Sequence, residues 1–187
     1  MDTFRTFIAI ELTSEVRARV AQHIACLRCE LPDVRASWSR DDNLHLTLKF
    51  LGNVPVADIP KVSDAVASAT KSVSSFELTV SGCGTFPPHG RPSVLWIGAQ
   101  ASGLHDLHVA LENELNGLGF PRESRPFHPH LTIARLRQSQ GARQLADLHQ
   151  SLAFEPTAFA VSEVVVFRSE LLKQGSKHTA ISRHALV

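Results

Sequence analysis

The chain has 187 residues, 43% of them hydrophobic, with 19 Lys and Arg against 18 Asp and Glu, a formal net charge of +1. This hydrophobic content excludes a disordered chain and is enough for a packed core. The balanced charge excludes a broad basic surface that binds many phosphates at once, so a small anionic group or the end of a charged chain is the expected ligand.

The first half of the chain predicts strands and helices in alternation. A β-branched and aromatic run over 4–12 is typical of a buried strand, and Thr13 or Ser14 before Glu15 is a helix start. That helix extends to about Leu31, where Pro32 breaks it. After it we expect a short strand around Trp38, a strand over 43–51 stopped by Gly52-Asn53, a helix over 59–69, and strands over 76–80 and 93–98 joined by a Gly- and Pro-rich loop over 82–92.

The second half repeats this order. A helix with a leucine stripe is expected over 104–118 and ends at Gly119. An apolar strand follows at 130–133, then a short helix over 142–152 and two final strands over 158–167 and 178–186. Mixed strands and helices with a half-length repeat predict an α+β architecture of two sheet-and-helix lobes.

One short string occurs twice, as His45-Leu46-Thr47-Leu48 and His130-Leu131-Thr132-Ile133. On a strand, residues two apart leave the same face, so each His and Thr should point together. Two imidazoles can act as acid and base near neutral pH, and the hydroxyls suit an anion. A single H-x-T is common in half-buried strands. Two copies 130 − 45 = 85 residues apart instead indicate one shared cleft.

Strict alternation along these strands also places their neighbours. It puts Lys49 on the face of the first histidine and Phe50 in the core. It puts Arg135 on the face opposite the second histidine, unless the strand ends or bulges there. His128 should border the cleft.

The cysteines and the N-terminal sequence indicate the compartment. Three cysteines are an odd number, which argues against a disulfide framework. Cys26 and Cys29 form a C-x-x-C away from the apolar stripe of their helix, without further ligands at zinc spacing, so we interpret them as reduced thiols. No apolar run reaches membrane-spanning length, and the start lacks the order of a secretory signal. We therefore expect a cytoplasmic protein and no membrane partner.

Metal binding is a weaker interpretation of the histidines. His105 and His108 are three apart on a helix, but no H-E-x-x-H pattern completes a site. A zinc site of His45, His128 and His130 is the alternative. The remaining histidines are interpreted as surface or packing residues: His23, His89, His149, His178 and His184. We expect no metal ligand.

Two longer runs resemble a known family. Residues 38–52 and 125–135 look like the two signature segments of the RNA 2′,3′-cyclic phosphodiesterases, also called 2′-5′ RNA ligases, of the two-histidine phosphoesterase superfamily. Residues 5–10 and 164–169 resemble its opening and penultimate strands, so nearly the whole chain is covered. Relatives often carry Tyr in the last two strands, whereas this chain has none, with Phe167 and His178 in that region.

This resemblance implies a single bilobal domain over residues 1–187, with two pseudo-twofold-related lobes of antiparallel sheet plus helices and a central cleft. It implies metal-independent hydrolysis of RNA or nucleoside 2′,3′-cyclic phosphates to 2′-phosphates. His130 would be the base and His45 the acid, and Thr47 and Thr132 would hydrogen-bond the phosphate.

The resemblance also implies that Arg135 and Phe50 contact the nucleotide, against the alternation argument. The expected partners are RNA ends or nucleotides that carry a 2′,3′-cyclic phosphate, tRNA fragments among them. We expect a monomer that needs no cofactor.

Three alternatives stay open. The same residues could join RNA ends through a 2′-5′ linkage or hydrolyse such linkages, because one transition state serves both directions. A module that binds a phosphorylated nucleotide end without turnover is the second, although binding alone would not need two protonatable groups. A metal-dependent hydrolase is the third, and resistance to a chelator would separate it from the first interpretation.

Overall fold

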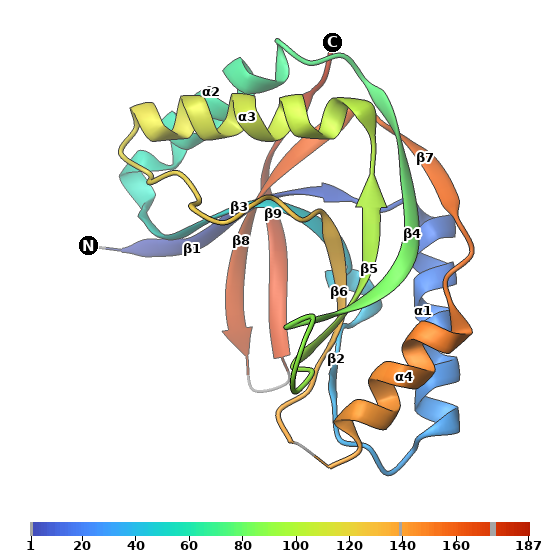
Figure 1. Cartoon of the computed structure of the whole chain (residues 1–187). Coiled ribbons are helices and arrows are strands. Elements are labelled where there is room, and N and C mark those ends of the chain that lie inside the picture. Colours follow the sequence, from blue (N-terminus) through green and yellow to red (C-terminus); the bar gives the residue numbers. More distant parts are fainter. Residues whose placement is uncertain (1, 139, 173–174) are drawn as a thin grey trace.

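The computed structural model describes residues 2–138, 140–172 and 175–187. Over these residues the chain forms two sheets, antiparallel at every pairing, and four α-helices (Figure 1). The four-stranded sheet has the order β3-β1-β8-β9, with β1 Thr3–Glu11, β3 His45–Pro55, β8 Glu163–Leu172 and β9 Gly175–Ala185. The five-stranded sheet has the order β2-β6-β5-β4-β7, with β2 Ser37–Trp38, β4 Phe76–Phe86, β5 Val94–Gln100, β6 His130–Arg135 and β7 Thr157–Val161. The α+β prediction is confirmed.

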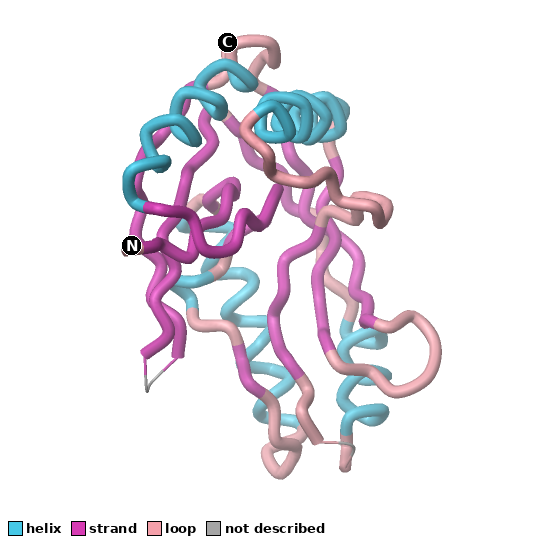
Figure 2. Tube along the Cα trace, turned by 90° about the vertical axis from the view of Figure 1, so that its left-hand side faces the viewer, coloured by secondary structure: helices cyan, strands magenta, loops and turns pink. Residues whose placement is uncertain are grey.

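The helices cover the two sheets in pairs. The five-stranded sheet carries α1 Ser14–Glu30 and α4 Ala142–Leu152, and the four-stranded sheet carries α2 Ile59–Thr70 and α3 Ser102–Gly117. Figure 2 shows one pair at the top of the molecule and the other at the bottom. The helix α1 starts where the sequence predicts, because the Thr13 hydroxyl accepts a hydrogen bond from the Val16 amide at 3.4 Å. None of the helices in the described residues is long and apolar enough to cross a membrane.

Each half of the chain contributes to both sheets. The strand predicted over 158–167 is in fact two strands, because β7 pairs within the five-stranded sheet and β8 within the four-stranded one. Ser162 alone separates them, and its carbonyl accepts a hydrogen bond from the Leu186 amide at 2.8 Å. One hydrophobic cluster includes residues from both sheets and from the covering helices.

Both motif strands contain a β-bulge at the fourth motif residue. The register of β3 against β1 skips Leu48, and that of β6 against β5 skips Ile133. A bulge places one extra residue in a strand, which inverts the alternation of faces for the residues that follow. Lys49 therefore turns into the core, 7% exposed, whereas Phe50 is 65% exposed and Arg135 is also exposed. The alternation prediction was wrong for all three side chains.

Two glycines lie at bends within strands. The sequence predicts instead that the strands end at these glycines. Gly52, with φ of +73°, lies at a second register shift within β3, and that strand continues to Pro55. Gly82, also with φ of +73°, lies at a shift within β4, which extends to Phe86. Glycine adopts this left-handed backbone conformation without a steric penalty. The predicted loop over 82–92 is correspondingly shorter.

Candidate active site

A cleft with a volume of about 1000 Å³ lies between the two sheets. Strands from both sheets line it, so the two copies of the motif face one cavity from opposite sides. All six residues singled out from the sequence line this cavity: His45, Thr47, Phe50, His130, Thr132 and Arg135. His128 lies next to it, in the wall of a smaller pocket.

The two motif histidines are held in the same way. The Nδ1 atom of His45 lies 2.7 Å from the carbonyl oxygen of Asn43, and that of His130 lies 2.6 Å from the carbonyl oxygen of His128. A carbonyl can only accept, so each ring must carry its proton on Nδ1 and donate it. The Nε2 atom of each neutral ring is left with a lone pair, ready to accept or return a proton.

His45 lies in an aromatic environment. Its ring is 4.8 Å from the Phe7 ring and 5.1 Å from the His178 ring, measured between centroids, and Phe167 lies behind. Burial among these groups, together with the charge of the nearby His178, lowers the pKa of His45 to about 4. The bond to the Asn43 carbonyl partly opposes this shift, because it favours the charged ring.

His130 has a different set of neighbours. Phe86 meets its ring edge-on at 5.0 Å, and the Trp96 ring lies 6.3 Å away. Burial lowers the pKa of His130, and the charges of Arg135 and His128 lower it as well, against the raising effect of the His128 carbonyl.

A smaller pocket of about 230 Å³ adjoins the main cleft at His130. Its wall includes the indole of Trp96, which lies flat over Gly84 in the neighbouring strand. A Cβ atom at Gly84 would come within 2.1 Å of the indole, so only glycine leaves room for this ring. The indole of Trp96 therefore forms part of the pocket wall beside His130.

The charges in the cleft differ from those of the whole chain. Four arginines are among the described lining residues, and no carboxylate is: Arg5, Arg40, Arg135 and Arg137. Of these, Arg40 is paired with Asp42 at 2.8 Å on the exposed rim. A site with this charge favours an anionic ligand, although the net charge of the protein is only +1.

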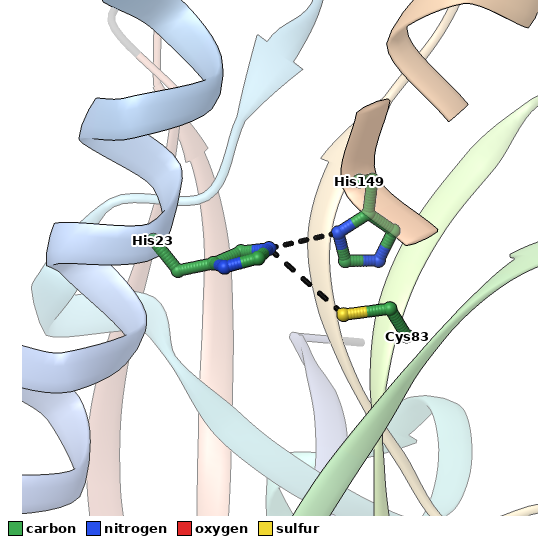
Figure 3. Close-up of side chains that lie close together, drawn as sticks. All are labelled: His23, Cys83 and His149. Atoms are coloured by element: carbon green, nitrogen blue, oxygen red, sulfur yellow. Dashed lines mark hydrogen bonds between the residues drawn. The ribbon is translucent and has the colours of Figure 1, made fainter. Parts of the chain in front are cut away.

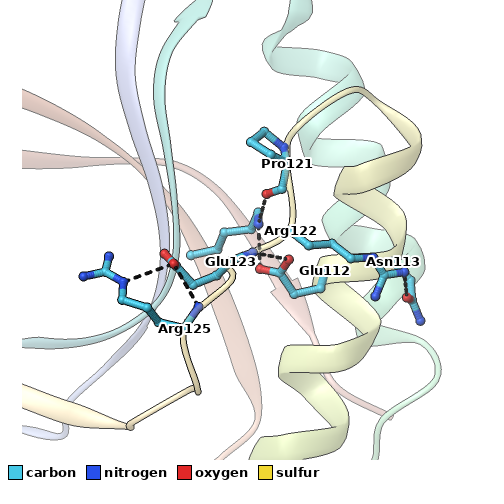
Figure 4. A network of polar contacts seen from close by, with 7 residues as sticks. Glu112, Asn113, Pro121, Arg122, Glu123 and Arg125 are labelled. Carbon is cyan, nitrogen blue, oxygen red and sulfur yellow. Dashed lines mark hydrogen bonds and ion pairs between the residues drawn. The ribbon is translucent and has the colours of Figure 1, made fainter.

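A buried ion pair and the hydrogen bonds around it anchor the first motif strand (Figure 4). Lys49 Nζ donates to Glu112 Oε1 at 2.6 Å and to the Pro121 carbonyl at 2.9 Å. Glu112 Oε2 accepts from the Glu123 amide at 3.2 Å. The first motif strand is thereby tied to α3 and to the loop that leads into the second motif. The sequence does not reveal this pair, because alternation places Lys49 on the wrong face.

His178 is the site residue that the sequence analysis missed. It was interpreted as a surface or packing residue, yet it lines the cleft and meets Phe7 edge-on at 4.9 Å. The available signal was its position in the last strand, one of the two strands where the family resemblance leads us to expect a tyrosine. Asn43, which orients His45, also donates to the Ser176 carbonyl at 2.6 Å, so β9 supports the first motif directly.

The described residues include one cluster suited to a metal ion, and it lies outside the cleft. It consists of His23, Cys83 and His149. His45, His128 and His130 do not form such a cluster among the residues that the structure describes.

Sequence comparisons connect this chain to RNA enzymes. The family model of the 2′-5′ RNA ligase superfamily matches residues 11–171. The RNA 2′,3′-cyclic phosphodiesterase of Thermotoga maritima is 33% identical over 172 residues, covering 91% of this chain and 89% of the relative. The one from Methanothermobacter thermautotrophicus is 31% identical over 177 residues, covering 94% and 95%. A third, from Geobacillus stearothermophilus, is 33% identical over 168 residues, which are 89% of this chain but 52% of that relative, so the chain spans about half its length.

Solved structures share the fold. A protein from Thermus thermophilus superposes with a TM-score of 0.82 at 26% identity, covering 97% of both chains. Escherichia coli LigT complexed with 3′-AMP has a TM-score of 0.76 at 26% identity, with 100% of this chain and 99% of LigT covered.

Proposed function

The chain belongs to the 2′-5′ RNA ligase superfamily, and on this basis we propose that it hydrolyses 2′,3′-cyclic phosphates on RNA ends or nucleosides. One observation carries the proposal. Two imidazoles, each oriented through Nδ1 by a backbone carbonyl, line one arginine-rich cleft together with two threonine hydroxyls. A pair of proton-transfer groups around an anion site is what this reaction needs.

The chemistry follows from the charge and strain of the substrate. A 2′,3′-cyclic phosphate is a monoanion, and opening it requires a base that deprotonates water and an acid that protonates the departing oxygen. In our proposal His130 Nε2 takes the proton from water, whose oxygen forms the new bond to phosphorus. The bond from phosphorus to the 3′ oxygen breaks, and His45 protonates that oxygen. The products are a 2′-phosphate and a 3′ hydroxyl group.

The other cleft residues stabilise the charge and hold the nucleotide. Thr47 and Thr132 would donate hydrogen bonds to the non-bridging phosphate oxygens, which gain charge in the transition state. Arg135 adds a fixed positive charge on the same side as His130. Phe50 presents an exposed aromatic face in the cleft, which suits stacking on a base.

We propose that the reaction needs no metal ion. The described lining of the cleft offers imidazole, hydroxyl and guanidinium groups but no carboxylate, the ligand that Mg²⁺ and Mn²⁺ prefer. The arginines and an imidazolium can offset the single negative charge of the substrate.

A second candidate is 2′-5′ ligation, or hydrolysis of 2′-5′ linkages, at the same residues. The cleft of about 1000 Å³ and the pocket of about 230 Å³ meet at His130. This arrangement offers room for a nucleotide on each side of the phosphate, which joining or cutting two RNA strands requires.

The deciding experiment uses nucleoside 2′,3′-cyclic phosphates in the presence of a chelator, with the product isomer identified by phosphorus NMR. We expect 2′-phosphates, at a rate that the chelator does not change, and no turnover of 3′,5′-cyclic nucleotides. A 3′-phosphate product would reverse the proposed leaving group. Activity that vanishes in chelator and returns with zinc would show a metal-dependent hydrolase.

We further propose that the protein is a cytoplasmic monomer acting on RNA ends such as tRNA fragments. Its three cysteines are free, with Cys26 and Cys29 exposed, as a reducing compartment allows. Light scattering at micromolar concentration tests the monomer, and turnover of RNA oligonucleotides against mononucleotides tests the substrate class.

A further inference from the structure

Three side chains far apart in the sequence meet behind the five-stranded sheet (Figure 3). They are His23 of α1, Cys83 of β4 and His149 of α4, and their ligand atoms all lie within 4.8 Å of one another. His23 Nε2 is 2.9 Å from His149 Nδ1 and 4.0 Å from Cys83 Sγ. We propose that this cluster, hereafter the His-Cys-His cluster, is a structural Zn²⁺ site.

The distances are close to those of a zinc site. Zinc bonds of about 2.0 Å to nitrogen and 2.3 Å to sulfur, in tetrahedral geometry, separate two nitrogens by about 3.3 Å and nitrogen from sulfur by about 3.5 Å. The observed separations are 2.9 Å and 4.0 Å. Small rotations of the side chains cover both differences, so no strand or helix has to move.

One ligand is already oriented by its surroundings. His149 is 0% exposed, and its Nε2 donates to the Trp96 carbonyl at 2.9 Å. The proton therefore sits on Nε2, and the Nδ1 lone pair points at the cluster. Such a bond from the second ring nitrogen to a carbonyl is the usual support of a metal-binding histidine.

The donor set selects the type of cation. One thiolate and two imidazoles suit zinc, whereas Mg²⁺ and Ca²⁺ prefer oxygen ligands. His23 and Cys83 are only half-buried, which leaves a path for the ion and for a water molecule in the fourth position. The thiol of Cys83 gives its proton to solvent when the ion binds.

The site would act on stability and not on the proposed chemistry. Cys83 pairs opposite Ile97 of β5, a core residue, so its side chain lies on the face of the sheet that α1 and α4 cover. The cleft lies on the other face, where Gly84 and the Trp96 indole meet. A bound ion would link two helices to the sheet, and only the folded chain would bind it well.

The test must exclude the exposed thiols of α1. Cys26→Ser/Cys29→Ser leaves Cys83 as the only thiol, because the chain has three cysteines. After dialysis against zinc and removal of excess, we expect one zinc per chain in this variant by elemental analysis. Replacing zinc with Co²⁺ should give the thiolate-to-metal absorption band. Zinc should also raise the Tm and slow alkylation of Cys83.

Matched variants locate the ligands. Adding Cys83→Ser or His23→Gln to the Cys26→Ser/Cys29→Ser protein should weaken zinc binding by at least roughly tenfold. Circular dichroism verifies that these variants fold. The alkylation measurement is independent of their folding, because it uses the Cys26→Ser/Cys29→Ser protein, in which all three cluster residues are intact. If the unaltered protein binds zinc and the Cys26→Ser/Cys29→Ser variant does not, Cys26 and Cys29 are the ligands and the proposal is wrong. No zinc in that background, or binding that survives Cys83→Ser, would leave a hydrogen bond between His23 and His149 and overturn the proposal.

Discussion

The strands β3 and β6 present the same motif with the same geometry, but in different environments. Each has a bulge at the fourth motif residue, and each histidine donates Nδ1–H to a carbonyl two residues before it. His45 lies against Phe7 and a second imidazole, that of His178, whereas His130 lies near the guanidinium of Arg135. The backbone arrangement is therefore duplicated, and the surroundings make the two histidines chemically different.

This difference bears on which histidine is acid and which is base. Burial and the His178 charge lower the pKa of His45 to about 4, so in the free protein it is neutral at pH 7 and suited to be a base. The family resemblance implies the opposite role for it. The anionic phosphate of a bound substrate favours imidazolium, so the proposed roles require that the substrate raise the pKa of His45. The following variants test the contributions of the residues around His45 and of those around His130 one at a time.

The largest expected effect comes from the histidines themselves. His45→Ala and His130→Ala should each lower kcat by about 10²–10⁴, because each removes one proton-transfer group. Initial rates on a nucleoside 2′,3′-cyclic phosphate measure this. His105→Ala, on an exposed part of α3, is the control and should leave kcat unchanged. A near-normal rate in either motif variant would rule out a shared acid–base site.

The stability of the protein should depend on a buried ion pair at β3 that has no counterpart at the matching position of β6. Lys49→Met leaves Glu112 charged and buried without its partner, which should cost about 3–5 kcal/mol of unfolding free energy, measured in urea. The matching position of the second strand, Ala134, carries no charge. The double variant Lys49→Met/Glu112→Leu should recover much of the loss. A single variant no less stable than the double one would mean that the ion pair does not anchor β3.

The residues that follow the bulges should affect substrate binding. Arg135→Ala should raise KM by roughly 10- to 150-fold, the equivalent of about 1.5–3 kcal/mol for a hydrogen bond to a charged group. Phe50→Leu should raise KM through lost base stacking, worth about 1–3 kcal/mol. Arg19→Ala, on the exposed face of α1, is the control. An unchanged KM in both cleft variants would mean that only the motif residues hold the nucleotide.

The pH dependence should differ between free protein and complex. One imidazole must be protonated and the other neutral, so the rate should be bell-shaped. Burial lowers both pKa values in the free protein, so kcat/KM should peak below pH 6.5, the ordinary histidine value. The peak of kcat should lie at higher pH, because bound phosphate raises both values. A flat kcat/KM profile between about pH 5 and 9 would remove the basis for pairing the histidines.

The smallest effect should come from His178. Its charge lowers the pKa of His45, so His178→Gln should raise that pKa and move one limb of the kcat/KM profile to higher pH. The limb set by His130, which has other neighbours, should stay in place. The limb that moves thus identifies His45. Movement of both limbs, or of neither, would contradict the separate environments described for the two histidines.

The sequence predicts the parts of this site that depend on local pattern. The paired faces of His45 and Thr47, and of His130 and Thr132, follow from the two-residue period of a strand. The bulges escape prediction, because Leu48 and Ile133 are apolar in either register. Only the family resemblance placed Phe50 and Arg135 in the cleft.

Features that depend on contacts between distant residues could not be predicted from the local sequence pattern. Gly52 and Gly82 have the signature of turns, yet strand pairing on both sides converts them into bends. The His-Cys-His cluster joins residues 126 positions apart, and no spacing rule connects them. The Cys26–Cys29 pair, by contrast, has a recognisable spacing but is exposed on a helix.

The single-residue junction at Ser162 has a mechanical consequence. Because β7 and β8 belong to different sheets and one residue separates them, we expect the backbone here to leave little room for one sheet to rotate against the other. The carbonyl of Ser162 also accepts a hydrogen bond from the Leu186 amide, and a movement of Ser162 away from Leu186 would break this bond. The protein should therefore not close on its ligand as two domains on a flexible linker do. Its amides around Val161 and Val164 should exchange slowly with deuterium, whether or not a nucleotide is bound.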